Sequence, residues 1–508
     1  MRTVRVLGMC LVGTEAELVT VEARFEPQER TRLEVAISGL PDAVIRESKG
    51  RLLAALEENR LHLPQGRLFV NLHPAGMRKS GEGLDLPLAL GAAAAAGHLT
   101  PSMLARTLFL GELGIDGRLH AVPGGLAAAR AAAAAGVSRV VAAEATAHEA
   151  ALWPGTSAFA ARELREVVGW VTSGQGLLPL VPKTELEEDA DAARAAAAAL
   201  DAIRGQGTAK RALVAAAVGG HALLFLGPPG TGKSLLARAL HGLLPPPTFA
   251  ERLDITRVLS AVGRWPGELA RARPFRAPHH TASHAGLVGG GSPPAAGEIT
   301  LAHAGLLFLD ELPEFRRETL EALRQPLESG AITISRAGRR LDLPARFQLV
   351  CAMNPCPCGY RGHPSIPCRC PPGEVFRYRR RISGPLLDRI ELRLELAAPA
   401  VRELGQRPVG GESGSELSRS VRAARERSLA RQGGRANAEL DSDQLDRVAP
   451  LEKRALALLE RSSASYGLSA RAVQALRRVA RTLADLEGST DVEERHLKEA
   501  LALRAPVA

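Results

Sequence analysis

The stretch GPPGTGKS, residues 227–234, decides the fold of the middle of this chain. It fits the pattern G-x-x-x-x-G-K-[ST], and the apolar run 222–226 before it predicts a strand, while residues 235–241 predict a helix. A loop in this position points backbone N–H groups at phosphate oxygens, its lysine reaches the β- and γ-phosphates, and its hydroxyl holds Mg²⁺. The sequence therefore predicts an α/β domain that binds a nucleoside triphosphate. The loop residues are Gly227, Pro228, Pro229, Gly230, Thr231, Gly232, Lys233 and Ser234.

Two later strands complete the predicted site. The apolar run 306–309 ends in Asp310 and Glu311. Asp310 can hold the water shell of Mg²⁺, and Glu311 can orient or activate the attacking water. A further strand, 346–354, ends in Asn354, whose amide can sense the γ-phosphate through that water. The alternative for Asn354 is an asparagine that only terminates a strand.

Two arginines are candidates for contact with the nucleotide. Arg389 lies in the apolar segment 384–390, and in ring ATPases such an arginine enters the neighbour's site and stabilises transition-state charge. Arg471 follows Ser469, a predicted helix N-cap, and is expected to approach the nucleotide from a helical lid. For both arginines a surface ion pair is the alternative.

Length, charge and composition limit the classes of protein. The chain has 508 residues, enough for three or so domains, and a net charge of +10 that suits a polyanionic partner. Aromatic residues make up only 3 %, which argues against a row of base-stacking platforms. No apolar run is long enough to span a bilayer, and Glu15 and Glu17 come too early for a signal peptide. We therefore expect a soluble, cytoplasmic protein with no membrane contact.

The pattern of elements divides the chain into three regions and a linker. Residues 1–172 alternate predicted strands with alanine-rich helices, and 173–188 lack periodicity. The ATP-binding core occupies 189–398, and residues 399–508 are predicted to be helical.

A cationic hairpin is predicted directly before the strand that ends in Asn354. Alternation over 331–343 flanks a turn at Ala337-Gly338, and three arginines surround the tip: Arg336, Arg339 and Arg340. Such a hairpin could track DNA phosphates in a channel, whereas a solvated charged turn is the alternative. A second basic cluster at 377–381 is less specific, and we expect it to serve a subunit interface.

Four cysteines crowd into the glycine- and proline-rich loop 356–370: Cys356, Cys358, Cys368 and Cys370. Four thiols so close together favour a tetrahedral, structural Zn²⁺ site, although the C-x-C spacing is tighter than the usual C-x-x-C. Free or redox-active thiols are the alternative. His279 and His280 lack the helical spacing of a zinc pair, and we do not assign them a metal.

The motifs together resemble the ComM/YifB family of magnesium-chelatase-like AAA+ ATPases. The resemblance covers essentially the whole chain and rests on GPPGTGKS (227–234), RPFRAPHHTAS (273–283), GEITLAHAGLLFLDEL (297–312), MNPCPCGY (353–360), SGPLLDRIEL (383–392) and YGLSARAVQALRRVARTLADL (466–486). It implies an AAA+ core with a parallel sheet and a helical lid, a homohexameric ring, and an ATP-driven helicase that promotes DNA branch migration in natural transformation. It gives the roles argued above to Lys233, Ser234, Asp310, Glu311, Asn354, Arg389 and Arg471.

The first region resembles the Lon-type protease domain, on residues 72–81 and 111–141. Lon-type enzymes need a serine activated by a lysine. The serine would fall near Asp85, and the lysine would fall near Leu126, where the chain has none. We therefore expect the fold without the peptidase chemistry, in a DNA-binding or ring-organising role with Arg78 and Lys79 as contact candidates.

Two other functions compete with the DNA motor. One is a magnesium-chelatase-type ATPase subunit that remodels a protein partner, which the cysteine loop and the full-length first region disfavour. The other is an ATP-dependent peptidase, which the missing serine and lysine disfavour.

Overall fold

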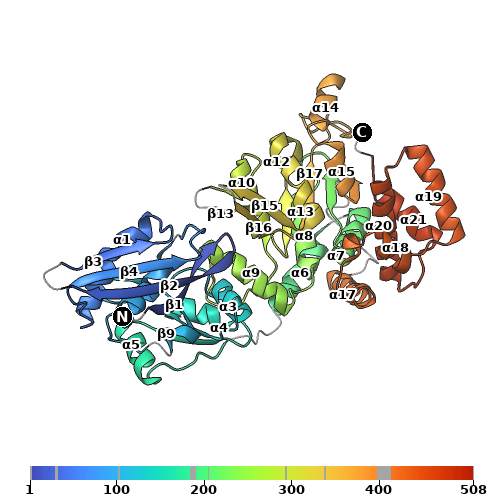
Figure 1. The fold of residues 1–508 in the computed structure, drawn as a ribbon. Helices are drawn as coiled ribbons and strands as arrows, with labels where there is room; N and C mark the ends of the chain where they lie inside the picture. Colours follow the sequence, from blue (N-terminus) through green and yellow to red (C-terminus); the bar gives the residue numbers. More distant parts are fainter. Residues whose placement is uncertain are drawn as a thin grey trace.

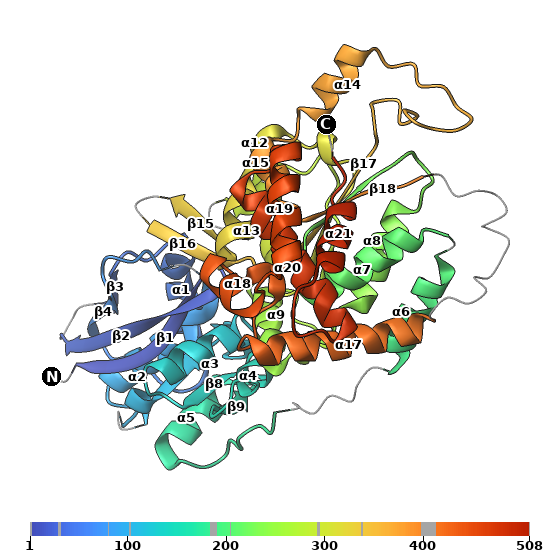
Figure 2. The ribbon, with the colours of Figure 1, turned by 90° about the vertical axis from the view of Figure 1, so that its right-hand side faces the viewer.

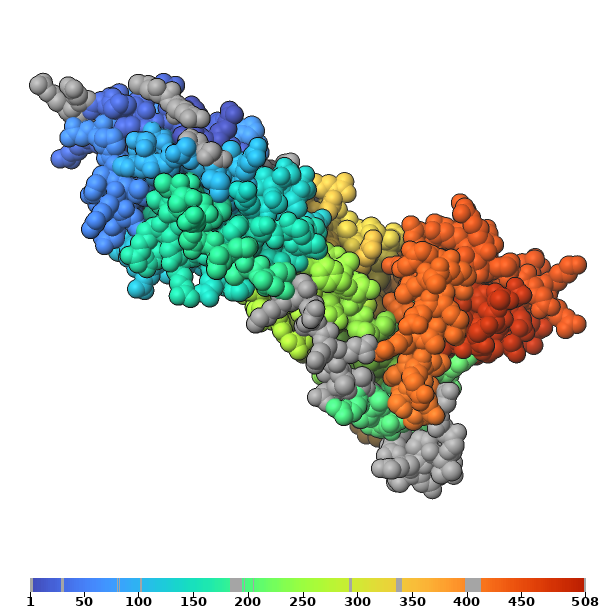
Figure 3. Space-filling model, turned by 90° about the horizontal axis from the view of Figure 1, so that it is seen from below, coloured from blue at the N-terminus to red at the C-terminus, as the bar shows by residue number. Residues whose placement is uncertain are grey.

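The computed structural model describes residues 3–28, 32–79, 81–100, 103–182, 190–203, 205–291, 295–336, 339–397 and 413–506. The first region, the ATPase core and the C-terminal helices follow one another in space as they do in the sequence (Figure 1). In the space-filling view the first region and the C-terminal helices occupy opposite ends of an elongated molecule (Figure 3).

The first region is built on a seven-stranded mixed sheet in the order β3-β4-β2-β1-β5-β8-β9. β1, β2 and β4 pair antiparallel, and the other neighbours pair parallel. Consecutive residues Val140 and Val141 of β8 enter different apolar clusters, so both faces of the sheet are covered. The strands are β1 Val4–Val12, β2 Glu15–Pro27, β3 Glu34–Ser38, β4 Gly66–His73, β5 Thr107–Leu110, β8 Arg139–Ala143 and β9 Ser157–Ala161, with a small ribbon of β6 Glu112–Leu113 and β7 Leu119–His120. The helices are α1 Ala43–Glu58, α2 Asp85–Ala95, α3 Gly125–Ala134, α4 Glu144–Ala151 and α5 Leu164–Ser173.

The ATPase core is a five-stranded parallel sheet in the order β11-β14-β17-β10-β18. Strand β10 is apolar throughout because both faces of the sheet are buried: Leu223 and Phe225 enter one cluster, and Leu224 and Leu226 enter the other. The strands are β10 Leu223–Leu226, β11 Phe275–Arg276, β14 Leu306–Leu309, β17 Gln348–Met353 and β18 Leu392–Glu395. The principal helices are α6 Ala190–Ala202, α7 Gly207–Gly219, α8 Lys233–Leu243, α9 Phe249–Ala261, α12 Arg317–Ala322, α13 Arg324–Ser329, α14 Pro372–Arg379 and α15 Gly384–Arg389.

The C-terminal helices share a hydrophobic core with the sheet. Leu476 and Val479 of α20 belong to the same cluster as Phe225 of β10, and Figure 2 shows α20 and α21 in front of α7 and α8. Ser469 caps α20 as predicted, since its hydroxyl accepts the N–H of Ala472 at 3.2 Å. The helices are α17 Gly414–Arg431, α18 Ser442–Val448, α19 Lys453–Tyr466, α20 Ala470–Glu487 and α21 Glu494–Ala502.

Helix α9 joins the core to the first region. Arg257 of α9 is buried and donates to the backbone oxygen of Thr14 at 3.0 Å and to the Glu15 carboxylate. Ser260 of the same helix accepts the N–H of Gly124 at 2.8 Å. A charged arginine can be buried here because its N–H groups have oxygen partners on the other region.

The predicted linker begins as an extension of the first sheet. The N–H of Leu180 donates to the carbonyl oxygen of Ala158 in β9 at 2.8 Å, and Pro179 forms a bridge with Phe159. Across the parts of the chain that the structure describes, no helix combines the length and the apolar character that a bilayer crossing requires.

Candidate ATP site

The phosphate loop connects β10 to α8, and the geometry of the backbone explains why two of its positions need glycine. Gly232 has φ of 82°, a left-handed conformation, immediately before α8. A Cβ on Gly227 would lie 2.7 Å from the carbonyl oxygen of Leu396, because the chain leaving β18 passes close by. The loop therefore requires glycine for its backbone turn and for its close packing on the sheet.

Lys233 lies at the first position of α8 and is largely buried. Its Nζ donates to the carbonyl oxygens of Gly227 and Pro228 at 2.7 and 2.9 Å and to Oδ1 of Asn354 at 3.1 Å. Burial lowers the pKa of Lys233, while the nearby carboxylates of Asp310 and Glu311 oppose this shift. The ammonium group is thus held inside the loop, with its three donors on oxygens that phosphate oxygens can replace.

Ser234 and Asp310 meet on the other side of the loop. The Ser234 hydroxyl donates to Asp310 Oδ2 at 3.0 Å, and the Glu311 N–H donates to Asp310 Oδ1 at 2.9 Å. A hydroxyl beside a carboxylate is a suitable oxygen pair for Mg²⁺ and its waters. Because β17 lies between β10 and β14, the ends of three adjacent parallel strands bring Asn354, the loop and Asp310 together.

His280 is a member of the site that the sequence did not reveal. Its Nδ1 lies 2.9 Å from Oε2 of Glu311, and its ring lies edge-on to Phe315 at a centroid distance of 6.5 Å. Glu311 has φ of 52°, a left-handed backbone conformation that a non-glycine residue rarely adopts. The only available signal was the HH pair at 279–280, and no local pattern links it to residue 311.

Arg389 and Arg471 lie together on one carboxylate. Both guanidinium groups contact Oε1 of Glu328 at the end of α13, and the distance for Arg471 is 2.6 Å. The Arg389 side chain is only 8 % exposed, and its Nε is buried without a hydrogen-bond partner among the described residues. Within that same described part of the chain, Arg471 contacts Glu328 and makes no hydrogen bond to the phosphate loop. Sequence reasoning missed Glu328, which contributes to this cluster from a third segment.

The arginine hairpin has the predicted backbone. β15 Ala331–Arg336 pairs antiparallel with β16 Arg339–Pro344, and Arg336 stands opposite Arg339. The turn at 337–338 and the side chains of Arg336 and Arg339 fall outside the described residues. Arg340 is exposed, and its Nε lies 3.4 Å from Asp342. The base of the hairpin packs on the first region, where a Cβ on Gly13 would lie 2.7 Å from Leu341 and Leu343.

The four predicted cysteine ligands converge. The sulfur atoms of Cys356, Cys358, Cys368 and Cys370 all lie within 4.8 Å of one another, and three of the pairs are 3.4–3.6 Å apart. Four sulfurs at tetrahedral Zn–S distances would be separated by roughly 3.8 Å. Backbone N–H groups of Tyr360 and Arg369 lower the pKa of the Cys358 thiol to about 6, whereas burial and the neighbouring thiols raise the pKa of Cys370 to about 12. The donor set fits a structural Zn²⁺.

The cysteine loop also touches the ATP site. Gly359 has φ of 86°, and a Cβ there would lie 2.9 Å from the ring of Pro229 in the phosphate loop. The segment that carries Cys356 and Cys358 follows Asn354 directly. A metal in this loop would thus stiffen one wall of the nucleotide site.

The first region has no peptidase dyad at the expected positions. Asp85 begins α2, is buried, and is bound by Arg51 at 2.9 Å, while Leu126 is fully covered. Burial raises the pKa of Asp85, although Arg51 opposes this shift. Lys79 is 0 % exposed and donates to the carbonyl oxygens of Gly39 and Pro74, so our suggestion that it contacts DNA is wrong for this conformation.

Three family models match successive parts of the chain. The model described as magnesium chelatase, subunit ChlI matches residues 199–404, the model for subunit ChlI of Mg-chelatase matches 21–146, and that for the ChlI C-terminal part matches 411–504. The match over 199–404 contains every candidate residue of the nucleotide site described above except Arg471, which lies in the match over 411–504. The ATPase core is therefore of the magnesium-chelatase type.

Full-length relatives come from several bacteria. The chain is 41 % identical to the uncharacterised protein YifB of Salmonella typhimurium, over 97 % of this chain and 95 % of the relative. It is also 41 % identical to the competence protein ComM of Haemophilus influenzae, over 98 % and 96 % of the two chains. An uncharacterised protein of Mycobacterium bovis is 37 % identical over 98 % of both. The chain therefore belongs to the ComM/YifB family of magnesium-chelatase-like AAA+ ATPases.

Proposed function

We propose that this ATPase is a DNA motor, a homohexameric ring that couples ATP hydrolysis to strand movement and promotes branch migration. The observation that carries the proposal is the separation of two sets of groups. Lys233, Ser234 and Asp310 form one set, whereas Arg389 and Arg471 lie together on Glu328. A neighbouring subunit that presents its Arg389 to this phosphate loop would complete the site, and Arg471 would approach the nucleotide from the helical lid.

Each residue of the loop has a defined task in hydrolysis. ATP supplies the phosphoryl group, and its Mg²⁺ neutralises charge on the β- and γ-phosphate oxygens. Ser234 and Asp310 would hold the metal and its waters. Lys233 would exchange the carbonyl oxygens of Gly227 and Pro228 for phosphate oxygens. Glu311 would orient the attacking water and accept its proton, and Asn354 would hold that water's geometry relative to Lys233.

The arginine hairpin supports DNA as the polymer. Its backbone places Arg336 opposite Arg339 at the tip, so positive charge gathers where β15 and β16 end. In a ring, three such arginines per subunit would follow the phosphate backbone without reading the bases. The name of the Haemophilus relative, a competence protein, agrees with a role in DNA handling.

The two rival functions predict different partners. A chelatase-type subunit would be stimulated by a protein partner and would be indifferent to DNA. A peptidase would need a nucleophile in the first region, where Asp85 is engaged by Arg51. Both are less well supported than the motor, because neither uses the arginine hairpin.

The deciding experiment measures ATP turnover and oligomeric state with single-stranded, duplex and branched DNA. We expect branched or single-stranded DNA to stimulate turnover and the variant Arg339→Ala/Arg340→Ala to lose most of that stimulation. Each arginine releases about one counterion, so the log–log salt slope of DNA binding should flatten by roughly two at most.

The matched control removes two exposed arginines of the first region, Arg162 and Arg165, which carry the same charge and pair with Glu144 and Glu163. This Arg162→Ala/Arg165→Ala variant should behave like the parent. DNA that neither binds nor stimulates the parent protein would overturn the motor, and an unchanged hairpin variant would show that the hairpin is a solvated turn.

A further inference from the structure

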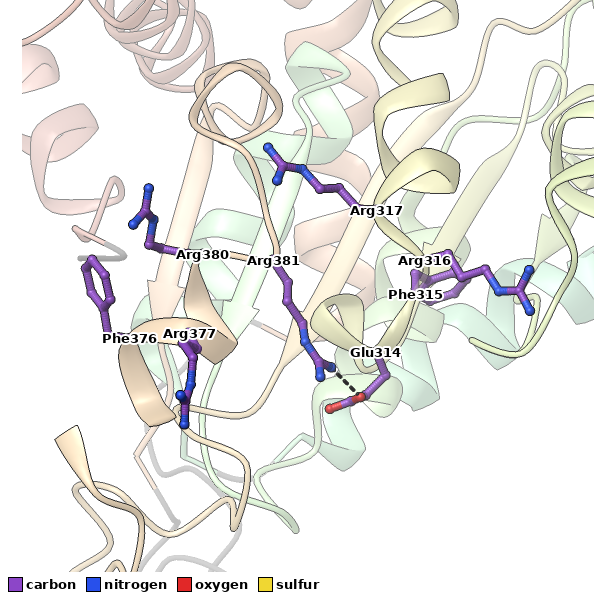
Figure 4. Close-up of a pocket in the computed structure, with 8 residues that line it drawn as sticks. All are labelled: Glu314, Phe315, Arg316, Arg317, Phe376, Arg377, Arg380 and Arg381. Atoms are coloured by element: carbon purple, nitrogen blue, oxygen red, sulfur yellow. Dashed lines mark hydrogen bonds and ion pairs between the residues drawn. The ribbon is translucent and has the colours of Figure 1, made fainter. Parts of the chain in front are cut away.

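A cationic pocket lies between the segment that follows Glu311 and helix α14. It has a volume of about 720 Å³ and is lined by Arg316, Arg317, Arg377, Arg380, Arg381 and Phe376, among others (Figure 4). All six of these side chains belong to exposed residues, and α14 projects from the core in both ribbon views. The pocket is separate from the phosphate loop and from the arginine hairpin.

Most of this positive charge has no counterpart in the pocket. Glu314 is the only acidic residue of the lining, and it is bound by Arg381 at 2.8 Å. Among the described residues, Arg316 and Arg377 make no side-chain hydrogen bond or ion pair. In Figure 4 the guanidinium group of Arg381 meets Glu314, while those of Arg377 and Arg380 point away from that carboxylate. Five arginines that line one cavity with a single carboxylate among them favour an anionic ligand.

The arginine and phenylalanine side chains indicate which class of anion the pocket suits. A guanidinium group matches phosphate oxygens with two parallel N–H donors, and several around one cavity suit a chain of phosphates better than a single ion. Phe376 is 60 % exposed, and the guanidinium carbon of Arg380 lies 5.1 Å from its ring centre. An exposed aromatic ring beside cations is the arrangement on which an unpaired base stacks while its phosphates are neutralised.

We propose that this pocket binds a short segment of single-stranded DNA, with phosphates on Arg377 and Arg380 and a base stacked on Phe376. A single strand has an unpaired base that can stack on Phe376, whereas the bases of a duplex are not free to do so. The inference rests on the proposed function, since it takes DNA as the polymer on which the motor acts. It adds a second contact that distinguishes single strands from duplex.

The test is fluorescence anisotropy of a labelled oligothymidine and of a duplex of equal length, with the full chain across a salt series. Arg377→Ala/Arg380→Ala should weaken single-strand binding at least about tenfold at low salt and flatten its log–log salt slope by about 1.4. Phe376→Ala should weaken single-strand binding about 5- to 100-fold and change duplex binding little, whereas Phe376→Trp should retain it. Arg162→Ala/Arg165→Ala is the control of equal charge and should match the parent.

The outcomes separate this inference from the proposed function. If the parent binds no DNA, the motor proposal itself fails. If the parent binds DNA and the pocket variants bind single strands as tightly as the control, the pocket is not a DNA site. If the variants shift the oligomeric state without DNA and bind single strands normally at a matched state, the pocket is a subunit contact and the inference is overturned.

Discussion

The phosphate loop and the arginine pair on Glu328 differ in how they are assembled. The loop groups come from the ends of three neighbouring strands, where Lys233 contacts Asn354 and Ser234 contacts Asp310. The arginine pair comes from α15 and α20, and both cations share one carboxylate from α13. One chain thus brings together the groups that are predicted to bind ATP, while the two arginines that are predicted to meet the nucleotide pair with a carboxylate elsewhere. The predictions below test whether this separation is functional.

The largest effect should come from the loop itself. Lys233→Ala should reduce ATP turnover to background, a loss of more than about 100-fold, because no other described cation reaches the phosphate position inside the loop. A coupled ATPase assay measures this, and Lys498→Ala, an exposed lysine paired with Glu494, is the control. Retained turnover would place the catalytic site elsewhere.

Removing Arg389 should lower ATP turnover almost as much in the assembled protein. Arg389→Ala should lower turnover by roughly 10³-fold while leaving ATP affinity nearly intact, because the arginine acts on charge that develops in the transition state. Glu311→Gln should bind ATP and hydrolyse it slowly.

A mixture of the Arg389→Ala and Glu311→Gln variants shows whether Arg389 acts on the ATP site of a neighbouring subunit or on that of its own subunit. Mixed rings contain interfaces where an intact Glu311 faces an intact Arg389, so part of the turnover should return. A mixture that stays inactive, although it assembles, would contradict the separation into two half-sites.

Replacing His280, which contacts Glu311 beside the phosphate loop, should have a smaller effect on ATP turnover. Its contact with Glu311 orients the carboxylate, so His280→Ala should lower kcat about tenfold and leave KM for ATP unchanged. His280→Asn, which keeps an N–H donor, should recover most of the rate. A loss in KM alone, or equal loss in both variants, would mean that the histidine only supports the fold.

The smallest effect should come from the cysteine loop. This loop touches the phosphate loop at Pro229 and makes no described contact with Glu328. Purified protein should contain about one Zn²⁺ per chain by the four-ligand argument. Chelation should lower Tm by about 4–8 °C, as expected for a loss of ~2 kcal/mol, and weaken ATP binding a few-fold. Restoring Zn²⁺ should reverse both changes. Metal-free protein with four titratable thiols would contradict the site.

Much of the nucleotide site could be predicted because its determinants are local. Gly227 to Ser234 are contiguous, and Asp310 and Asn354 each end an apolar strand that must lie in the same parallel sheet. Parallel strands place their carboxyl ends along one edge, so the meeting of these groups follows from the strand pattern. The hairpin at 331–344 could be predicted equally well, since alternating apolar and polar residues on both sides of a two-residue turn indicate it.

The contacts that tertiary structure alone decided join segments without a shared pattern. His280 reaches Glu311 only because of the path of the loop after β11, and Glu328 meets Arg389 and Arg471 only where α13, α15 and α20 converge. Lys79 looked like a surface cation, yet it is buried on the backbone oxygens of two other segments. The order of residues along the chain sets which chemical groups each strand and loop can offer. The packing of the helices decides which charged side chains lie beside a partner of opposite charge, because these pairs join residues that are far apart in the chain.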